Sequence, residues 1–142
     1  MLYELVKTIL AIEANTALIN LCSNILGKMI SLKDNNFKYI ALRTLQIVAK
    51  TDLPSVQKHK NTILECMKDN DISIQRRALD LVYLIINTTN IKHIIKECLN
   101  FLVVAENEIK VELTSKVKFI NLFRYASLLK HILHRTNGRL TL

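Results

Sequence analysis

Four cationic side chains are the residues of this sequence best suited to bind a ligand. Lys58 and Lys60 lie close together, and Arg76 and Arg77 follow further along the chain. Ammonium and guanidinium groups bind carboxylates and phosphates. One hypothesis is therefore a contact for an acidic protein or a phosphoinositide headgroup. The alternative is a solvated rim, balanced by the nearby carboxylates of Glu65, Asp69, Asp71 and Asp80.

Residues for metal or catalytic chemistry do not gather in this sequence. His131 and His134 share a helix face, but no nearby cysteine or carboxylate completes a zinc site. His59, seven residues before Cys66, is interpreted as a surface histidine beside a core cysteine. Two glycines cannot build a phosphate-binding loop. We therefore expect no cofactor, no metal and no enzyme activity.

The cysteines are an odd and widely spaced set. Cys22, Cys66 and Cys98 each lie within an apolar helical pattern. This pattern predicts free, buried thiols in a reducing compartment.

The net charge of +8 is unevenly distributed. Residues 1–112 hold 14 Lys or Arg against all 12 acids, whereas residues 113–142 hold six Lys or Arg and no acid. A basic protein that binds nucleic acid or anionic membrane is therefore an alternative that depends on the last thirty residues.

Helical spacing of apolar residues extends over nearly the whole chain. The stretch 69–90 is typical: three polar residues that can cap a helix, an apolar helical pattern, and a polar end at Asn87 to Asn90. The pattern predicts about seven to eight helices and no strand. Their expected ranges are 2–14, 16–32, 35–50, one beginning after Thr51 or Asp52, the 69–90 stretch, one beginning at Asn90, 106–123 and 125–135.

A repeat of about 37 residues decides the expected architecture. Shifting the chain by 37 superimposes Asp34 on Asp71 and Ala41 on Ala78, and a shift near 35 extends the pattern to Ile109. The other matched pairs are Phe37 with Ile74, Leu42 with Leu79, Leu45 with Val82, and Val48 with Ile85. Two helices per period predict an all-α superhelix, a solenoid of the HEAT or armadillo kind. The expected repeats cover about 16–50, 53–87 and 90–123.

Several stretches resemble the trunk of the adaptin family, the large subunits of clathrin adaptor complexes. They are LYELVKTILAI near the start, NILGKMISLKDNNFKYIALRTL from Asn24 to Leu45, and the run from Thr51 to Leu102. Within that run, VQKHKNTILECMKD and SIQRRALDLVYLIIN resemble the γ type in particular. The α and ε types are the nearest alternatives.

The resemblance implies a scaffold that acts in vesicle-mediated protein transport and cargo sorting at the trans-Golgi network and endosomes. The implied partners are β-type, medium and small adaptin subunits, with clathrin and an Arf-type GTPase reached through the full complex. The implied location is cytoplasmic and peripheral on those membranes and on clathrin-coated vesicles, and no nucleic acid is expected. No binding residue is carried over from the family.

Two expectations concern the extent of the chain. Residues 1–117 are expected to be an internal segment of an adaptin trunk. Residues 118–142 depart from the family pattern and are expected to be either a real basic extension or an artefact of the gene model.

Overall fold

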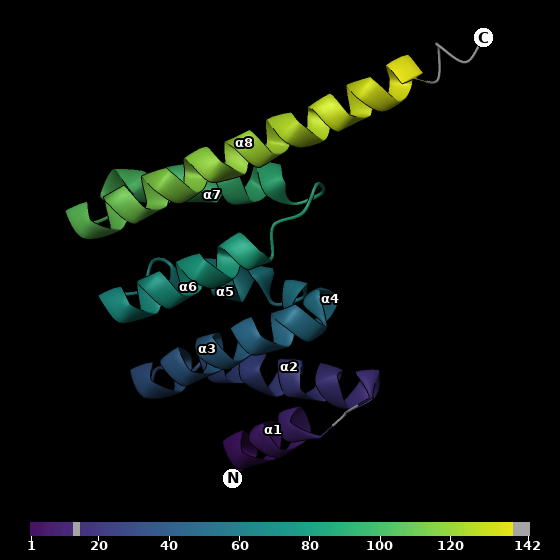
Figure 1. The fold of residues 1–142 in the computed structure, drawn as a ribbon. Coiled ribbons are helices and arrows are strands. Elements are labelled where there is room, and N and C mark those ends of the chain that lie inside the picture. Colours follow the sequence, from purple (N-terminus) through teal and green to yellow (C-terminus); the bar gives the residue numbers. More distant parts are fainter. Residues whose placement is uncertain (13–14, 138–142) are drawn as a thin grey trace. The chain divides into compact units, whose positions relative to one another are not determined.

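The computed structural model describes residues 1–12 and 15–137; beyond Leu122, side chains are described only at Ala126, Lys130 and His134. The described residues form helices and no strand (Figure 1). The helices are α1 (Leu2–Ala11), α2 (Thr16–Ile30), α3 (Asn35–Thr51), α4 (Leu53–Gln57), α5 (Lys60–Cys66), α6 (Ile72–Leu84), α7 (Ile91–Val104) and α8 (Asn107–Asn137). The predicted all-α class of paired HEAT-like helices is confirmed.

Side-chain caps fix where four of these helices begin. Asp34 Oδ1 accepts hydrogen bonds from the backbone N–H groups of Asn36 and Phe37, and Asp71 Oδ1 accepts from Ser73 N at 2.8 Å. Asp52 caps α4 and Asn15 caps α2 in the same way. Such caps satisfy N–H groups that have no partner inside the helix. The 37-residue register therefore repeats the cap as well as the apolar face.

Two helix boundaries differ from the prediction. The helix expected after Asp52 is broken into α4 and α5 at Lys58 and His59, where the His59 backbone (φ −95°, ψ 13°) leaves helical geometry. The helices expected over 106–123 and 125–135 are one continuous helix, α8. Arg124 and its neighbours include no proline or glycine, so nothing in that stretch interrupts the backbone ladder.

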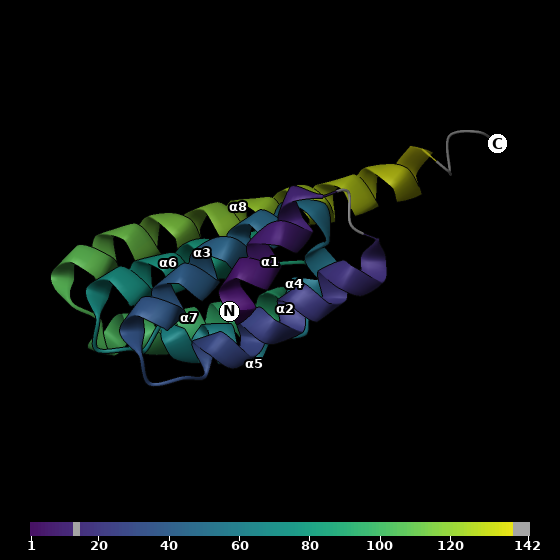
Figure 2. The same ribbon diagram turned by 90° about the horizontal axis from the view of Figure 1, so that it is seen from below.

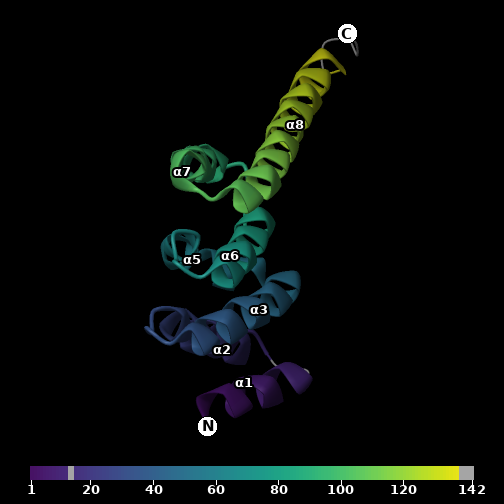
Figure 3. The ribbon, with the colours of Figure 1, turned by 90° about the vertical axis from the view of Figure 1, so that its left-hand side faces the viewer.

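The chain divides into two compact units, residues 1–86 and 87–142. In the first unit, α3 lies between α2 and α6, α5 pairs with α6, and α2 contacts α4 and α5. Figures 2 and 3 show α3 and α6 side by side in one layer, with α2 and α5 in a second. Ala41 and Ala78 are fully buried at equivalent positions, as are Leu45 and Val82. Small residues at these positions allow neighbouring helices to approach closely.

One register position departs from the pattern. Ile74 is buried, yet its equivalent Phe37 is 45% exposed. Helix α6 packs on α3, whereas α1 packs mainly on α2 rather than on α3. Phe37 and Ile74 therefore match in the register but differ in burial.

The second unit is the pair α7 and α8. Ile94, Cys98 and Phe101 of α7 are buried, and so are Ile109 and Leu113 of α8. The turn before α7 is closed by two asparagines: Asn87 N donates to Asn90 Oδ1 at 2.8 Å, and Asn90 N donates to Asn87 Oδ1 at 2.9 Å. These reciprocal bonds satisfy the backbone at a helix start that has no conventional side-chain cap.

The break between α4 and α5 packs closely on α2 because Gly27 of α2 has no side chain. A methyl group at Gly27 would overlap the imidazole ring of His59. His59 is half-buried, its Nε2 is enclosed, and burial, together with the charge of Lys58, lowers its pKa. The prediction of a surface histidine is therefore wrong: the ring packs directly on the α2 backbone, at a position where only glycine leaves room.

The Ala78 position provides a test of the register. Ala78→Trp should overfill the fully buried site and lower the free energy of unfolding by about 1–3 kcal/mol or more. Urea unfolding followed by circular dichroism measures this. Ser73→Trp, at an exposed position of the same helix, is the control. Equal stability of the two variants would contradict the register.

The contact between Gly27 and His59 predicts a suppressor. Alanine is intrinsically better than glycine in a helix by about 1 kcal/mol, yet Gly27→Ala should destabilise the chain because the new methyl group displaces the imidazole. His59→Ala should restore stability in the Gly27→Ala background while destabilising the parent chain. A double-mutant cycle by urea unfolding measures the coupling. Additive effects of the two changes would show that the contact is loose.

Candidate partner-binding surfaces

The two predicted lysines lie at the break between α4 and α5. Lys58 is exposed, and its Nζ donates to Asn20 Oδ1 of α2 at 2.9 Å. Lys60 is the first residue of α5 and is half-buried. Lys58 thus links the end of α4 to α2, and its side chain is still accessible to a partner.

The two predicted arginines lie in the first half of α6. The guanidinium of Arg77 stacks over the ring of Tyr39 in α3, 5.2 Å from the ring centroid. Its Nε and Nη2 donate to the Tyr39 hydroxyl at 3.2 and 3.0 Å. Cation–π stacking combined with hydrogen bonding is typical of arginine rather than lysine. Arg77 therefore ties α6 to α3.

The lysine pair lies at the start of α5, whereas the arginine pair lies partway along α6. Gln57 Nε2 donates to Ile85 O at 3.0 Å, which places the α4–α5 break beside the end of α6. Arg77 precedes Ile85 by about 12 Å along a helix that rises 1.5 Å per residue. The structure places Lys58 and Lys60 at the break between α4 and α5, and Arg76 and Arg77 within α6. A contact with an acidic partner at either pair stays a prediction.

Among the acids expected to balance this rim, Asp69 has a specific role. Its Oδ2 accepts from Lys38 Nζ at 2.6 Å in an ion pair whose side chains are only 12% and 19% exposed. Burial opposes ionisation of Asp69. The Lys38 ammonium and the backbone N–H groups of Asp71 and Asn70 outweigh that effect and lower its pKa. The hydrogen bond to Asp69 raises the pKa of Lys38. The carboxylate is thus committed to joining the two repeats.

A second polar cluster joins α2 to the start of α4. Ser23, buried in α2, donates from Oγ to Ser55 O at 2.9 Å. Ser55 Oγ lies 2.7 Å from Asn20 Oδ1 and 2.5 Å from the Asp52 carboxylate. Buried hydroxyl groups require such partners. The cluster is saturated by its own members, which favours a structural role.

The predicted free and buried state of the cysteines is confirmed for Cys22, Cys66 and Cys98. Burial raises the pKa of Cys66 and of Cys98 to about 11. A thiol with such a pKa is neutral near pH 7, and only the thiolate is a good nucleophile or metal ligand. These positions therefore belong to the core.

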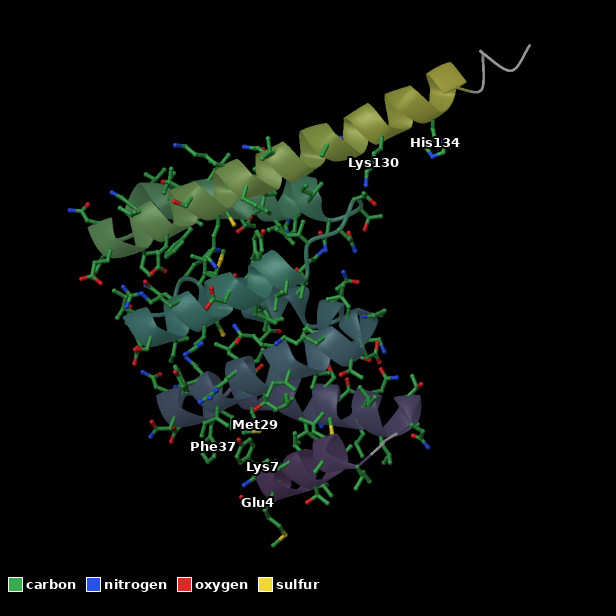
Figure 4. The ribbon with its side chains drawn as sticks, viewed as in Figure 1. Glu4, Lys7, Met29, Phe37, Lys130 and His134 are labelled. Carbon is green, nitrogen blue, oxygen red and sulfur yellow. The ribbon has the colours of Figure 1, made fainter. Side chains whose placement is uncertain are left out.

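The remaining candidates for chemistry are dispersed. In the described part of the chain, no three His, Cys, Asp or Glu side chains are grouped as a metal site. His134 is exposed on α8 on the same side as Lys130 (Figure 4), and the side chain of His131 lies outside the described residues. No helix among the described residues is long and apolar enough to cross a membrane.

Exposed apolar side chains are the most prominent feature available for binding. On α1 they are Leu2 and Leu5, at 60% and 46% exposure. In the second unit the most exposed are Val103 and Val104 of α7, at 79% and 76%, and Val111, Phe119 and Leu122 of α8, at 70%, 56% and 67%. Exposed apolar groups of this size mark surfaces that another chain or segment covers.

Sequence reasoning missed the residues that join one repeat to the next. The sequence pattern assigns no role to Lys38, Tyr39 or Asn20, yet each bonds to a residue more than thirty positions away. The 37-residue register could have suggested a contact for Tyr39, because its equivalent position in the next repeat is Arg76, beside Arg77. No comparable sequence signal identified Asn20.

These features define a class of protein: an all-helical repeat protein with exposed apolar side chains. The model of the "Adaptin N terminal region" family matches residues 1–122. The chain is 47% identical over 116 residues to AP-1 complex subunit gamma of Dictyostelium discoideum, which covers 82% of this chain and 13% of that protein. It is 49% identical over 116 residues to AP-1 complex subunit gamma-2 of Arabidopsis thaliana, a match that covers 82% of this chain and 14% of that protein.

The chain therefore belongs to the adaptin family. A more distant match is AP-2 complex subunit alpha-1 of Arabidopsis thaliana, 34% identical over 121 residues, 84% of this chain and 12% of that protein. The two gamma-type relatives named above are more similar to this chain, in agreement with the resemblance noted in the sequence. The chain spans 13–14% of the length of the two gamma-type relatives.

The Lys38–Asp69 pair gives a testable consequence. Asp69→Asn should lower the free energy of unfolding near pH 7 by about 1–3 kcal/mol, because it weakens a largely buried, charge-assisted bond. Glu65→Gln, which removes the exposed 3.5 Å pair with Lys68, should change it by less than about 1 kcal/mol.

The same pair has a defined pH dependence. The pKa of Asp69 is lower in the folded chain, so its contribution is complete above the unfolded pKa, near 4, and disappears as the pH falls through the folded value. Urea unfolding from pH 7 to pH 3 should therefore show a gap between the parent chain and Asp69→Asn that closes with acid. A constant gap would contradict this assignment.

Proposed function

We propose that this chain is a scaffold segment of the gamma-type large subunit of an AP-1-like clathrin adaptor complex. Its role is to hold other subunits in place during vesicle-mediated protein transport and cargo sorting. The observation that carries the proposal is the match to gamma-type subunits at 47–49% identity over 82% of the chain. No catalytic or cofactor-dependent step is part of the proposal.

The exposed apolar surfaces support a role in assembly. Val103 and Val104 lie near the end of α7, and Leu2 and Leu5 lie on α1. Burying apolar surface is the main driving force for association between protein chains. These faces are suited to contact with further repeats or with other subunits.

The proposed partners are a β-type, a medium and a small adaptin subunit. Clathrin and an Arf-type GTPase would be reached through the assembled complex. The proposed location is the cytoplasmic face of trans-Golgi and endosomal membranes and clathrin-coated vesicles, with peripheral attachment. An α-type role is the alternative, and the lower identity of 34% to the AP-2 alpha relative disfavours it.

Purification from cells tests this proposal. A tagged product of the whole gene should co-purify with β-type, medium and small adaptin chains, identified by mass spectrometry, and should localise to the trans-Golgi. Val104→Asp should reduce recovery of these chains several-fold, because it places a charge on an exposed apolar position of α7. Asn100→Asp, exposed on the same helix and carrying the same new charge, should not.

Other outcomes would identify a different function. Recovery with AP-2-type subunits would favour the α-type alternative. Recovery of nucleic acid that dissociates steeply with salt would indicate a basic nucleic-acid-binding protein, since released counterions make such binding salt-sensitive.

A further inference from the structure

Helix α8 has two apolar faces. Ile109, Leu113, Val117 and Ile120 follow steps of four, four and three residues and are all buried. Val111, Ser115, Phe119 and Leu122 follow the same steps, displaced by two residues, and are all exposed. A displacement of two residues is about 200° around a helix of 3.6 residues per turn. The second face therefore points away from the first.

This second face, here called the α8 outer face, consists of Val111, Ser115, Phe119, Leu122 and Ala126. Val111, Phe119 and Leu122 are 70%, 56% and 67% exposed. Large side chains at 111, 119 and 122 are interrupted by small ones at 115 and 126. Such a pattern makes the knobs and holes into which a second helix packs.

The charge at the edges of the α8 outer face is positive from Lys118 onward. Lys118 is exposed beside Phe119, and Lys130 is exposed one turn beyond Ala126. No Asp or Glu occurs from residue 113 to the end of the sequence. Glu108 and Glu112 precede this region, so the charge changes sign along the helix.

We propose that the α8 outer face binds an amphipathic helix of another protein whose apolar seam is flanked by acidic residues. The acids face Lys118 and Lys130, and the apolar seam packs on Phe119 and Leu122. The change of sign at Glu112 sets the direction of the bound helix, because its less acidic end lies beside Val111. This inference goes beyond the proposed function and does not depend on it.

The geometry favours a helix over the other occupants. Helices that lie on membranes present a broad apolar face to lipid, whereas this face is a narrow row and the opposite side of α8 is already packed. A second copy lying parallel to the first would bring its own Lys118 and Lys130 against the same lysines, and like charges in an interface oppose association. The sedimentation measurement below tests an antiparallel copy.

Two synthetic peptides test the proposal with the purified 142-residue chain. Both are fluorescein-labelled amphipathic helices with the same leucine seam; one carries glutamates at the flanking positions and the other lysines. Fluorescence anisotropy should show that the acidic peptide binds at least tenfold more tightly than the basic one. Its affinity should fall several-fold on raising the salt, because edge charges are screened.

Matched variants locate the binding site. Leu122→Gln should weaken the acidic peptide at least fivefold, because it removes an apolar contact. Asn121→Gln, at the neighbouring exposed position off this face, should leave the affinity within twofold. Circular dichroism should show equal helix content in both, since neither residue is buried.

Four results would overturn the proposal. Equal affinity for the two peptides would exclude recognition of acidic edges, and equal effects of the two substitutions would exclude the α8 outer face. Binding to phosphatidylserine vesicles that needs Leu122, without binding to the acidic peptide, would show a lipid surface instead. Sedimentation as a dimer that Leu122→Gln dissociates, again without peptide binding, would show a second copy as the occupant.

Discussion

A pair of helices in this fold cannot bury all of its apolar surface by itself. Helix α3 illustrates the constraint, because it packs on its own partner α2 and also on α6 of the next pair. Ala41, Leu42 and Leu45 are consequently buried without exception. Cooperation between neighbouring pairs is thus a requirement for stability in repeat proteins. Helices at the limits of such a unit keep an uncovered face, as α1 does with Leu2 and Leu5.

Polar contacts give the apolar stack its specificity. Apolar residues at a repeating spacing would pack almost as well if one helix slid along another, since hydrophobic burial has no direction. The Lys38–Asp69 pair and the Arg77–Tyr39 contact, both between residues more than thirty positions apart, are satisfied in one arrangement only. They occur once each and do not follow the 37-residue repeat. The repeat supplies the packing energy, and these unique contacts select the alignment.

The sequence predicted most of the helices because local chemistry determines them. Asp34, Asp52 and Asp71 mark helix starts wherever they occur, and apolar spacing is legible without a structure. The exposure of Phe37 and the break at His59 were not predictable in this way. Both depend on the neighbouring helices, on α1 packing mainly on α2 in one case and on a glycine backbone in the other. The four cations were recognisable as candidates, but their places at the α4–α5 break and within α6 required knowledge of how the helices pair.

The three buried cysteines give the chain its own reporters of motion. Cys22 and Cys66 belong to the first unit and Cys98 to the second. A thiol enclosed in a core reacts with a soluble disulfide reagent only when the surrounding helices separate for a moment, so its rate of modification follows the local opening equilibrium. The modification rate of Cys22 would therefore report the opening of the first unit, and that of Cys98 the opening of the second. In an assembly, the same rates would reveal which unit is held more firmly by its neighbours.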